Sequence, residues 1–161
     1  MSVAAVKSHL AEYGLADRII EFDASSATVE LAAEDLGCEP ALIAKTMACE
    51  VDGHAVLVVC AGDAKLWSSA FKKQFGTKPR FVQKDMLDEV VGHPMGGVCP
   101  FAVKPDVEVY LDVSLKRFEH VYPAAGSANS AVKLTVPELE ACSKSLGWVD
   151  VCKDWREEAA A

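Results

Sequence analysis

Two stretches of this chain carry residues whose types and spacing could do chemistry. The first runs from Gly92 to Phe101 and holds three glycines and two prolines. Glycines let the backbone adopt positive φ and approach another group closely, whereas prolines fix φ and remove amide donors. A loop of this kind is typical of a tight helix-to-strand connection. It can equally hold backbone N–H groups towards a ligand oxygen, so both interpretations stay open.

Cys99 and His93 lie in this loop, six residues apart. A thiol beside an imidazole could act as a nucleophile with its base. No Asn or Asp that could orient the histidine lies nearby in the sequence. A small, packed side chain is therefore the favoured interpretation of Cys99.

The second stretch is a predicted β-hairpin around Asp52-Gly53, which is a favoured pair for a two-residue type I′ turn. Pairing Val51 with His54 fixes the register and places Lys45 opposite Cys60. By period-two alternation, Lys45 shares its face with Met47, Cys49, Val51, Val56 and Val58.

A lysine on such an apolar face must either reach water from the end of its strand or serve a cleft, because sealing in a charge is costly. Thr46, Ala48, Leu57 and Val59 make the other face apolar too. If Lys45 and the glycine-rich loop form one site, they must lie on the same side of the sheet.

The elements that would position these residues follow from periodicity and from the glycine stops. Helices are expected at 3–13, 29–36, 64–75, 85–91 and 136–146, with a cap at Ser25, Ser26 or Thr28 and a capping box from Thr135 to Glu138. Strands are expected at 18–22, 44–51, 54–60, 107–112, 120–125, 131–134 and 148–152, with Pro123 marking an edge or a bulge. This order predicts a mixed sheet with helices packed around it.

The chain has 161 residues, of which 51% are hydrophobic and 25% charged, so we expect one globular domain over 1–152 and a tail over 153–161. No apolar run suits a membrane span and no secretory signal is evident, which favours the cytoplasm. The six cysteines include no Cys-x-x-Cys pair and the four histidines are isolated, so neither a metal nor a cofactor is expected.

The net charge of −8 argues against DNA as a partner. Its distribution is uneven, because 64–84 contains six Lys and Arg residues and no carboxylate. This segment is either a solvated helix and loop or a local patch that contacts phosphates.

Four motifs, taken in order, resemble the YbaK-type domain. They are Lys45-Thr46 at the start of a hairpin strand, the G-x-x-x-P segment from Gly96 to Pro100, the strand 109–112, and Ala125-Gly126 ahead of 132–139. That family comprises free-standing proteins and the editing insertion of bacterial prolyl-tRNA synthetases. The resemblance covers nearly the whole chain.

The resemblance implies a mixed α/β fold around a curved, barrel-like sheet, and hydrolysis of misacylated tRNA, commonly proline tRNA that carries cysteine or alanine. Lys45 would be the key lysine and the 96–100 segment the substrate-binding loop. We therefore expect catalysis to involve Lys45, Gly96, Gly97, Val98 and Cys99, with the loop acting through its backbone amides. Substrate binding is expected to involve Thr46, Pro100, Gly126, Ser127 and Asn129.

Some cysteine-clearing members of the family carry an Asp just after the later glycine motif. At that position this chain has Ala131 or one of the nearby polar residues Ser127, Asn129 and Ser130, which leaves the amino acid open. The expected partners are misacylated tRNA and prolyl-tRNA synthetase. Two alternatives are a non-catalytic module that binds a tRNA end or a protein, and a thiol hydrolase built on Cys99.

Overall fold

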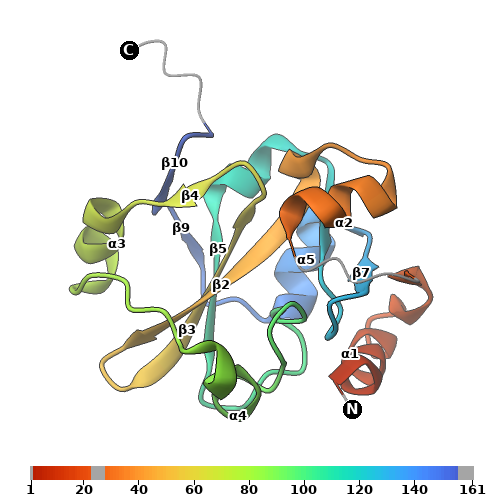
Figure 1. Cartoon of the computed structure of the whole chain (residues 1–161), viewed down its shortest axis with the longest axis horizontal. Coiled ribbons are helices and arrows are strands. Elements are labelled where there is room, and N and C mark those ends of the chain that lie inside the picture. Colours follow the sequence, from red (N-terminus) through yellow and green to blue (C-terminus); the bar gives the residue numbers. More distant parts are fainter. Residues whose placement is uncertain (1, 23–27, 156–161) are drawn as a thin grey trace.

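The computed structural model describes residues 2–22 and 28–155, and its main feature is a curled six-stranded sheet (Figure 1). The strand order is β8-β6-β2-β3-β5-β9, with both parallel and antiparallel neighbours. The strands are β2 (Ile43–Val51), β3 (His54–Ala61), β5 (Glu108–Asp112), β6 (His120–Pro123), β8 (Leu134–Thr135) and β9 (Trp148–Val149). The prediction of a mixed α/β fold with a curved sheet is confirmed.

Helices surround this sheet, and Figure 1 shows α2 and α3 on opposite sides of the β2–β3 hairpin with α4 beyond its lower part. The α-helices are α1 (Ser2–Ala11), α2 (Val29–Leu36), α3 (Ser68–Phe75), α4 (Leu87–Val90) and α5 (Val136–Ser143). The 3-10 helices are η1 (Ala16–Arg18), η2 (Pro40–Leu42), η3 (Lys84–Met86) and η4 (Val113–Arg117). In the described residues, no helix is both long and apolar enough to cross a membrane.

The hairpin has the predicted register, with Val51 opposite His54 and Lys45 opposite Cys60. Asp52 and Gly53 both have positive φ, at 50° and 85°, as a type I′ turn requires. The local chemistry of two turn residues therefore fixes the partners along two long strands.

Both faces of the hairpin are buried. The face of Leu57 and Val59 packs into the larger core with α1, α4 and α5. The face of Lys45 packs through Val56 and Val58 against Phe71 of α3 and the C-terminal segment. Lys45 is thus the one charged residue on a hairpin face whose other side chains pack mainly in a second hydrophobic core.

The prediction of a helix over 64–75 is wrong at its start. Lys65 and Leu66 form β4, which pairs with β10 (Cys152–Lys153), and the helix begins only at Ser68. The Trp67 amide donates to the Val151 carbonyl at 2.8 Å, which continues this pairing. A partner strand almost ninety positions away therefore overrides the local helical pattern.

The C-terminal predictions also need correction. The strand expected over 148–152 is two strands in two sheets, β9 beside β5 and β10 beside β4. The capping box of Thr135 and Glu138 is confirmed, but α5 ends at Ser143 instead of 146, because Lys144 takes a left-handed conformation with φ 55°. The single strand expected over 131–134 is β7 (Ser130–Val132), paired with β1 (Ile19–Glu21), followed by β8.

Two further expectations concern α2 and β6. Thr28 caps α2 by accepting a hydrogen bond from the Leu31 amide, whereas Ser25 and Ser26 lie outside the described residues. Pro123 is expected to mark an edge or a bulge, and of these two alternatives the edge strand is wrong, because β6 lies between β2 and β8. Since β8 pairs only with His120 and Val121, Pro123 lies beyond the last residue of β6 that β8 reaches.

Candidate active site

A break in strand pairing along β2 creates the site. On the edge of β2 away from β3, pairing with β6 ends where Ala44 meets Pro123. Farther along, the Val82 amide donates to the Ala48 carbonyl at 3.0 Å, and Phe81 bridges Cys49. Between these points, the edge of β2 at 45–47 pairs with no other strand in the described part of the chain.

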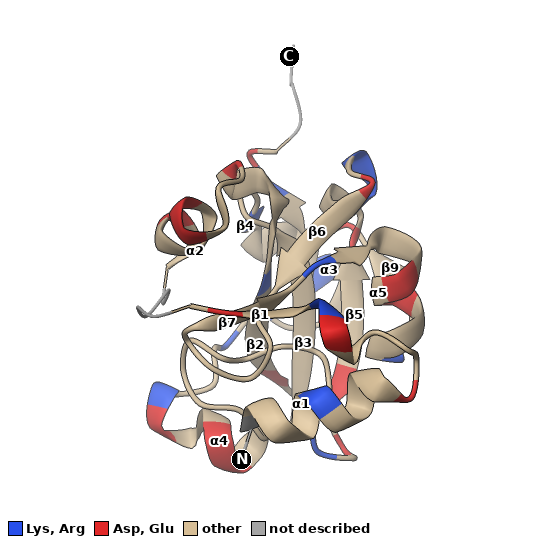
Figure 2. Cartoon of the chain, turned by 90° about the vertical axis from the view of Figure 1, so that its right-hand side faces the viewer, with Lys and Arg blue, Asp and Glu red and all other residues tan. Residues whose placement is uncertain are grey.

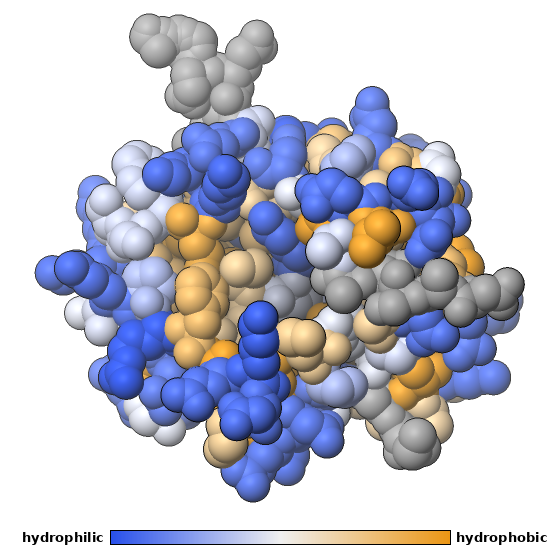
Figure 3. Space-filling model, viewed as in Figure 1, coloured by the Kyte–Doolittle hydropathy of each residue, from blue (hydrophilic) through white to orange (hydrophobic). Residues whose placement is uncertain are grey.

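A cavity of about 400 Å³ opens at this break, which is within the range of small-molecule sites. Its lining includes Lys45 and Thr46 of β2, Gly96 and Val98 of the glycine-rich loop, and Ala131 of β7. Figure 3 shows a hollowed apolar strip over the hairpin, with hydrophilic side chains around it. Lys45 and the glycine-rich loop therefore share one cavity, although the expectation that they lie on the same side of the sheet is wrong. Cys99 and Phe101 of the loop pack in the larger core, on the face of Leu57 and Val59, and the cavity reaches Lys45 across the open edge of β2.

The Lys45 ammonium is held by a single long hydrogen bond, 3.5 Å from Nζ to the Gly62 carbonyl. Position 62 requires glycine, because an added Cβ would lie 1.9 Å from the Pro40 carbonyl oxygen. The described residues offer Lys45 no carboxylate partner within ion-pair distance. Its remaining N–H donors are available to an anionic ligand in the cavity.

Thr46 presents three polar groups that have no partner among the described residues. Its Oγ1 is buried and makes no hydrogen bond to any described residue. Strand alternation also turns its amide and carbonyl towards the unpaired edge, since Ala48 and Glu50 use that same edge to bond the 80–82 segment. Buried polar groups without partners are costly, which favours a ligand that pairs with them.

The glycine-rich loop packs directly on the later glycine motif. An added Cβ on Gly97 would lie 2.5 Å from the Gly126 carbonyl carbon and from the Ser127 nitrogen. Gly96 and Gly126 both have positive φ, at 87° and 99°. Only glycine at position 97 lets these two backbones touch, so the two motifs form one unit.

The loop amides differ in their availability. The Gly97 amide donates to the Pro94 carbonyl at 3.0 Å and is therefore already engaged within the turn. In the residues that the structure describes, the amides of Gly96, Val98 and Cys99 donate no hydrogen bond. Of these three residues, Gly96 and Val98 line the cavity, so their amides suit an oxyanion best.

The Cys99 side chain is not built as a nucleophile. It is fully buried beneath the loop and outside the cavity lining, and burial raises the pKa of its thiol to about 12. The His93 Nε2 atom lies 3.5 Å from the sulfur, but it also lies 2.6 Å from the Phe101 carbonyl, to which a protonated Nε2 donates. Burial lowers the pKa of His93, so this imidazole is neutral and its Nε2 proton is engaged.

The polar residues after Gly126 mostly bond one another. The Ser127 hydroxyl donates to Asn129 Oδ1 at 2.7 Å, and Asn129 Nδ2 donates to the Phe22 carbonyl at 3.0 Å. Neither side chain lines the cavity, and the buried Pro100 does not line it either. Ser130 and Ala131 line it instead. Of the residues that follow Gly126, these two are therefore the ones that a ligand in the cavity would contact.

Sequence reasoning missed part of the cavity. No sequence pattern indicates that the Gly62 carbonyl holds Lys45. The lining also includes Val29 and Ala32 of α2, Lys84 and Met95. The lysine could have been found from the basic run over 64–84, but no local pattern indicates that α2 covers this edge.

The electrostatics of the cavity contrast with the rest of the molecule. Its lining contains two lysines, Lys45 and Lys84, and no Asp, Glu, His or Cys among the described residues. Figure 2 shows carboxylates on α2, α4 and α5. Within the described residues, no group of three or more His, Cys, Asp and Glu could hold a metal ion. A cavity with two lysines and no carboxylate in its described lining, in an acidic protein, suits a small ligand that carries a phosphate.

These features define a ligand-binding α/β domain whose site combines a strand-edge lysine with a glycine-rich loop. The chain belongs to the aminoacyl-tRNA editing domain family, whose model matches residues 23–142. The uncharacterized protein YwhH of Bacillus subtilis (strain 168) is 47% identical over 156 residues, which covers 96% of this chain and 99% of YwhH.

Solved structures agree with this assignment. A candidate trans-editing enzyme for prolyl-tRNA synthetase superposes with a TM-score of 0.85 at 25% identity, over 94% of this chain and 97% of that one. The hypothetical protein APE2540 superposes with a TM-score of 0.82 at 26% identity, over 92% and 99% of the two chains. The resemblance to the YbaK-type editing domain is confirmed at the level of family and fold.

Proposed function

We propose that this protein is a trans-editing deacylase that acts in the cytoplasm. It removes a small, wrongly attached amino acid, cysteine or alanine, from misacylated proline tRNA, and so serves prolyl-tRNA synthetase. The observation that carries the proposal is the shared cavity. It brings together the Lys45 ammonium, which forms no ion pair with a described residue, with polar groups of Thr46 and amides of Gly96 and Val98 that have no hydrogen-bond partner among the described residues.

An aminoacyl ester is already activated, so its hydrolysis needs positioning and polarisation more than a protein nucleophile. The amides of Gly96 and Val98 would donate to the carbonyl oxygen as negative charge develops on it. Lys45 would pair with the terminal phosphate or orient the 3′ adenosine, and Thr46 would pair with polar groups of the aminoacyl end. Water would be the attacking group.

The cavity favours a small, uncharged side chain on the amino acid. Ala131, which follows the later glycine motif, lines the cavity together with Ala32 and Val98. An apolar wall of this kind discriminates only weakly between side chains that differ by a methyl or a thiol. Cysteine and alanine therefore both remain candidate substrates.

The test is a panel of proline tRNAs misacylated with cysteine, alanine or serine. We expect release of cysteine or alanine well above the rate of spontaneous ester hydrolysis, measured with radiolabelled amino acid. Release no faster than in buffer for every substrate would contradict a deacylase. Correctly charged prolyl-tRNA serves as the control and should persist.

A second candidate is a binding module that holds a tRNA end or a partner protein without turnover. One observation favours it: in the described residues, no carboxylate or histidine lines the cavity to act as a general base. Tight binding of the tRNA without ester loss in the same panel would support this alternative.

Replacing Cys99 with serine is expected to change kcat/KM by less than about threefold, because the thiol is buried, protonated and outside the cavity. The serine hydroxyl can still bond the Phe101 carbonyl beside it. The measurement is deacylation of the best panel substrate, together with the rate of iodoacetamide labelling at Cys99, which should be slow. A hundredfold loss of activity in a folded Cys99→Ser variant would instead establish a thiol hydrolase.

A further inference from the structure

One exposed aromatic ring borders both the candidate active site and a second hollow. The second cavity, of about 620 Å³, lies at the turn of the hairpin, where Gly53 and His54 contribute to its lining. Phe81 lines this cavity and also the candidate active site. Its ring therefore stands on the boundary between the two.

Phe81 is held on a fixed backbone although its side chain is 56% exposed. The residue bridges Cys49, and its neighbours bond β2, with the Glu50 amide donating to the Arg80 carbonyl at 2.8 Å. Met95, from the glycine-rich loop, also lines the candidate active site and is 53% exposed. Two apolar side chains from different segments thus stand exposed at the mouth of the site.

The two cavities that Phe81 borders differ in the charges of their lining residues. The second cavity is lined by the carboxylates of Glu50, Glu89 and Asp106 as well as by Arg80 and Lys104, which makes it a poor place for phosphates. The candidate active site has Lys84, three residues after Phe81, and no carboxylate in its described lining. A polyanion that leaves the site would pass over Phe81 on the side of Lys84.

We propose that Phe81 stacks on the base of the nucleotide that precedes the terminal adenosine of the tRNA, while Lys84 contacts a phosphate of this single-stranded end. The proposal rests on the proposed function for the identity of the RNA. Stacking of a base on an aromatic side chain contributes about 1–3 kcal/mol and tolerates any base. Phe81 is then a positioning residue that acts on binding and not on the chemical step.

The first test compares two substrates that carry the same amino acid, full-length misacylated tRNA and 3′-aminoacyl-adenosine, which lacks the preceding nucleotide. Phe81→Ala should lower kcat/KM for the tRNA about 5- to 150-fold, chiefly through KM, and change kcat/KM for aminoacyl-adenosine less than about twofold. Phe81→Trp should retain activity on the tRNA. An equal loss on both substrates, or no loss on either, would overturn the proposal.

A second test does not depend on turnover. Fluorescence anisotropy would measure binding of a short RNA ending in CCA and of the same RNA without the base that precedes the terminal adenosine. Phe81→Ala should weaken binding of the intact RNA but not of the abasic one. Equal weakening of both would refute the stacking, whereas intact stacking without ester hydrolysis would count against the deacylase alone.

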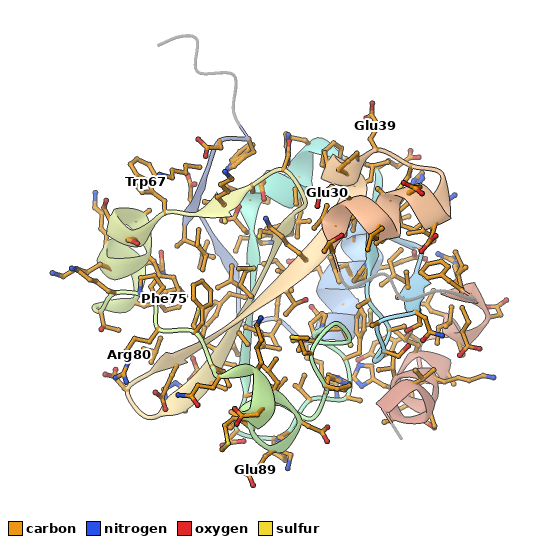
Figure 4. The ribbon with its side chains drawn as sticks, viewed as in Figure 1. Glu30, Glu39, Trp67, Phe75, Arg80 and Glu89 are labelled. Carbon is orange, nitrogen blue, oxygen red and sulfur yellow. The ribbon has the colours of Figure 1, made fainter. Side chains whose placement is uncertain are left out.

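Matched variants control for surface and fold. Trp67 is another exposed aromatic residue in the basic segment; it lines neither cavity, and Figure 4 shows it at the far end of α3 from Arg80. Trp67→Ala should leave kcat/KM unchanged for both the misacylated tRNA and the aminoacyl-adenosine. Phe81→Leu keeps apolar bulk but loses the stacking face, so it should behave like Phe81→Ala if the ring stacks.

Lys84 is tested by the salt dependence of RNA binding. Lys84→Ala should reduce the slope of log K against log salt by about 0.7, as expected when one phosphate contact to a single strand is lost. Lys72 of α3 is also exposed and lines neither cavity, so Lys72→Ala is the control. Equal slopes for the Lys84 variant and the wild type would remove Lys84 from the interface.

Discussion

Replacing Lys45 with methionine is expected to lower kcat/KM for misacylated tRNA about 100- to 1000-fold while leaving the protein folded. Methionine keeps most of the apolar stem that lies along β2, but it removes the cation that faces the cavity. Losing the charge that holds the terminal phosphate or the 3′ adenosine misplaces the reacting ester, and a misplacement of about 1 Å costs on the order of 100-fold. The measurement is deacylation under single-turnover and steady-state conditions.

The fold should tolerate the change because Lys45 makes only one hydrogen bond among the described residues, at 3.5 Å to the Gly62 carbonyl. We expect the free energy of unfolding to shift by less than about 1 kcal/mol, since this bond is long and only partly buried. Lys65→Met is the control, because Lys65 is exposed and does not line the cavity. A folded Lys45→Met variant with full activity would remove Lys45 from the mechanism.

The kinetic pattern also separates the two roles proposed for Lys45. If the ammonium holds the terminal phosphate in both the ground state and the transition state, KM should rise and kcat should stay constant. If it orients the 3′ adenosine so that the ester is placed for attack, kcat should fall. Lys45→Arg keeps the charge but changes its shape, so it should restore phosphate binding more readily than catalysis.

Local signals in the sequence were sufficient to predict the hairpin and the helix ends that surround the site. The Asp52-Gly53 turn set the hairpin register and therefore the face of Lys45. The Thr135–Glu138 capping box marked the start of α5, and Gly37 and Gly76 ended α2 and α3 with positive φ. Each of these features depends on residues a few positions apart, which is why sequence alone could place them.

Non-local pairing accounts for what the sequence could not give. Lys65 and Leu66 read as part of a helix because nothing near them reveals the C-terminal strand that pairs with them. The cavity itself exists because β6 stops pairing with β2 at Pro123 and the 80–82 segment takes over only at Ala48. Such an unpaired stretch is a property of three distant segments, so the cavity-facing polar groups of Thr46 could not be derived from the strand pattern.

Replacing Gly97 with alanine is the second prediction with a large expected effect, and it tests the contact between the two glycine motifs. The added Cβ would lie 2.5 Å from backbone atoms of Gly126 and Ser127, and backbone atoms cannot move aside as the end of a side chain can. The two loops must separate, which should destabilise the fold by about 1–3 kcal/mol. A displacement near 1 Å at the Gly96 and Val98 amides should lower kcat by about 100-fold.

Position 97 suits this test because its φ is not positive, so alanine adds bulk without backbone strain. Gly76→Ala is the matched control, because its φ of +83° makes alanine strained while nothing lies within 4 Å of the added Cβ. Gly76→Ala should therefore lower Tm but retain kcat, whereas Gly97→Ala should lose kcat at temperatures where it remains folded. Both variants should lower stability, but only Gly97→Ala pushes two backbones apart. Equal kcat values for the two variants would therefore show that the contact between the loops does not position the reacting ester.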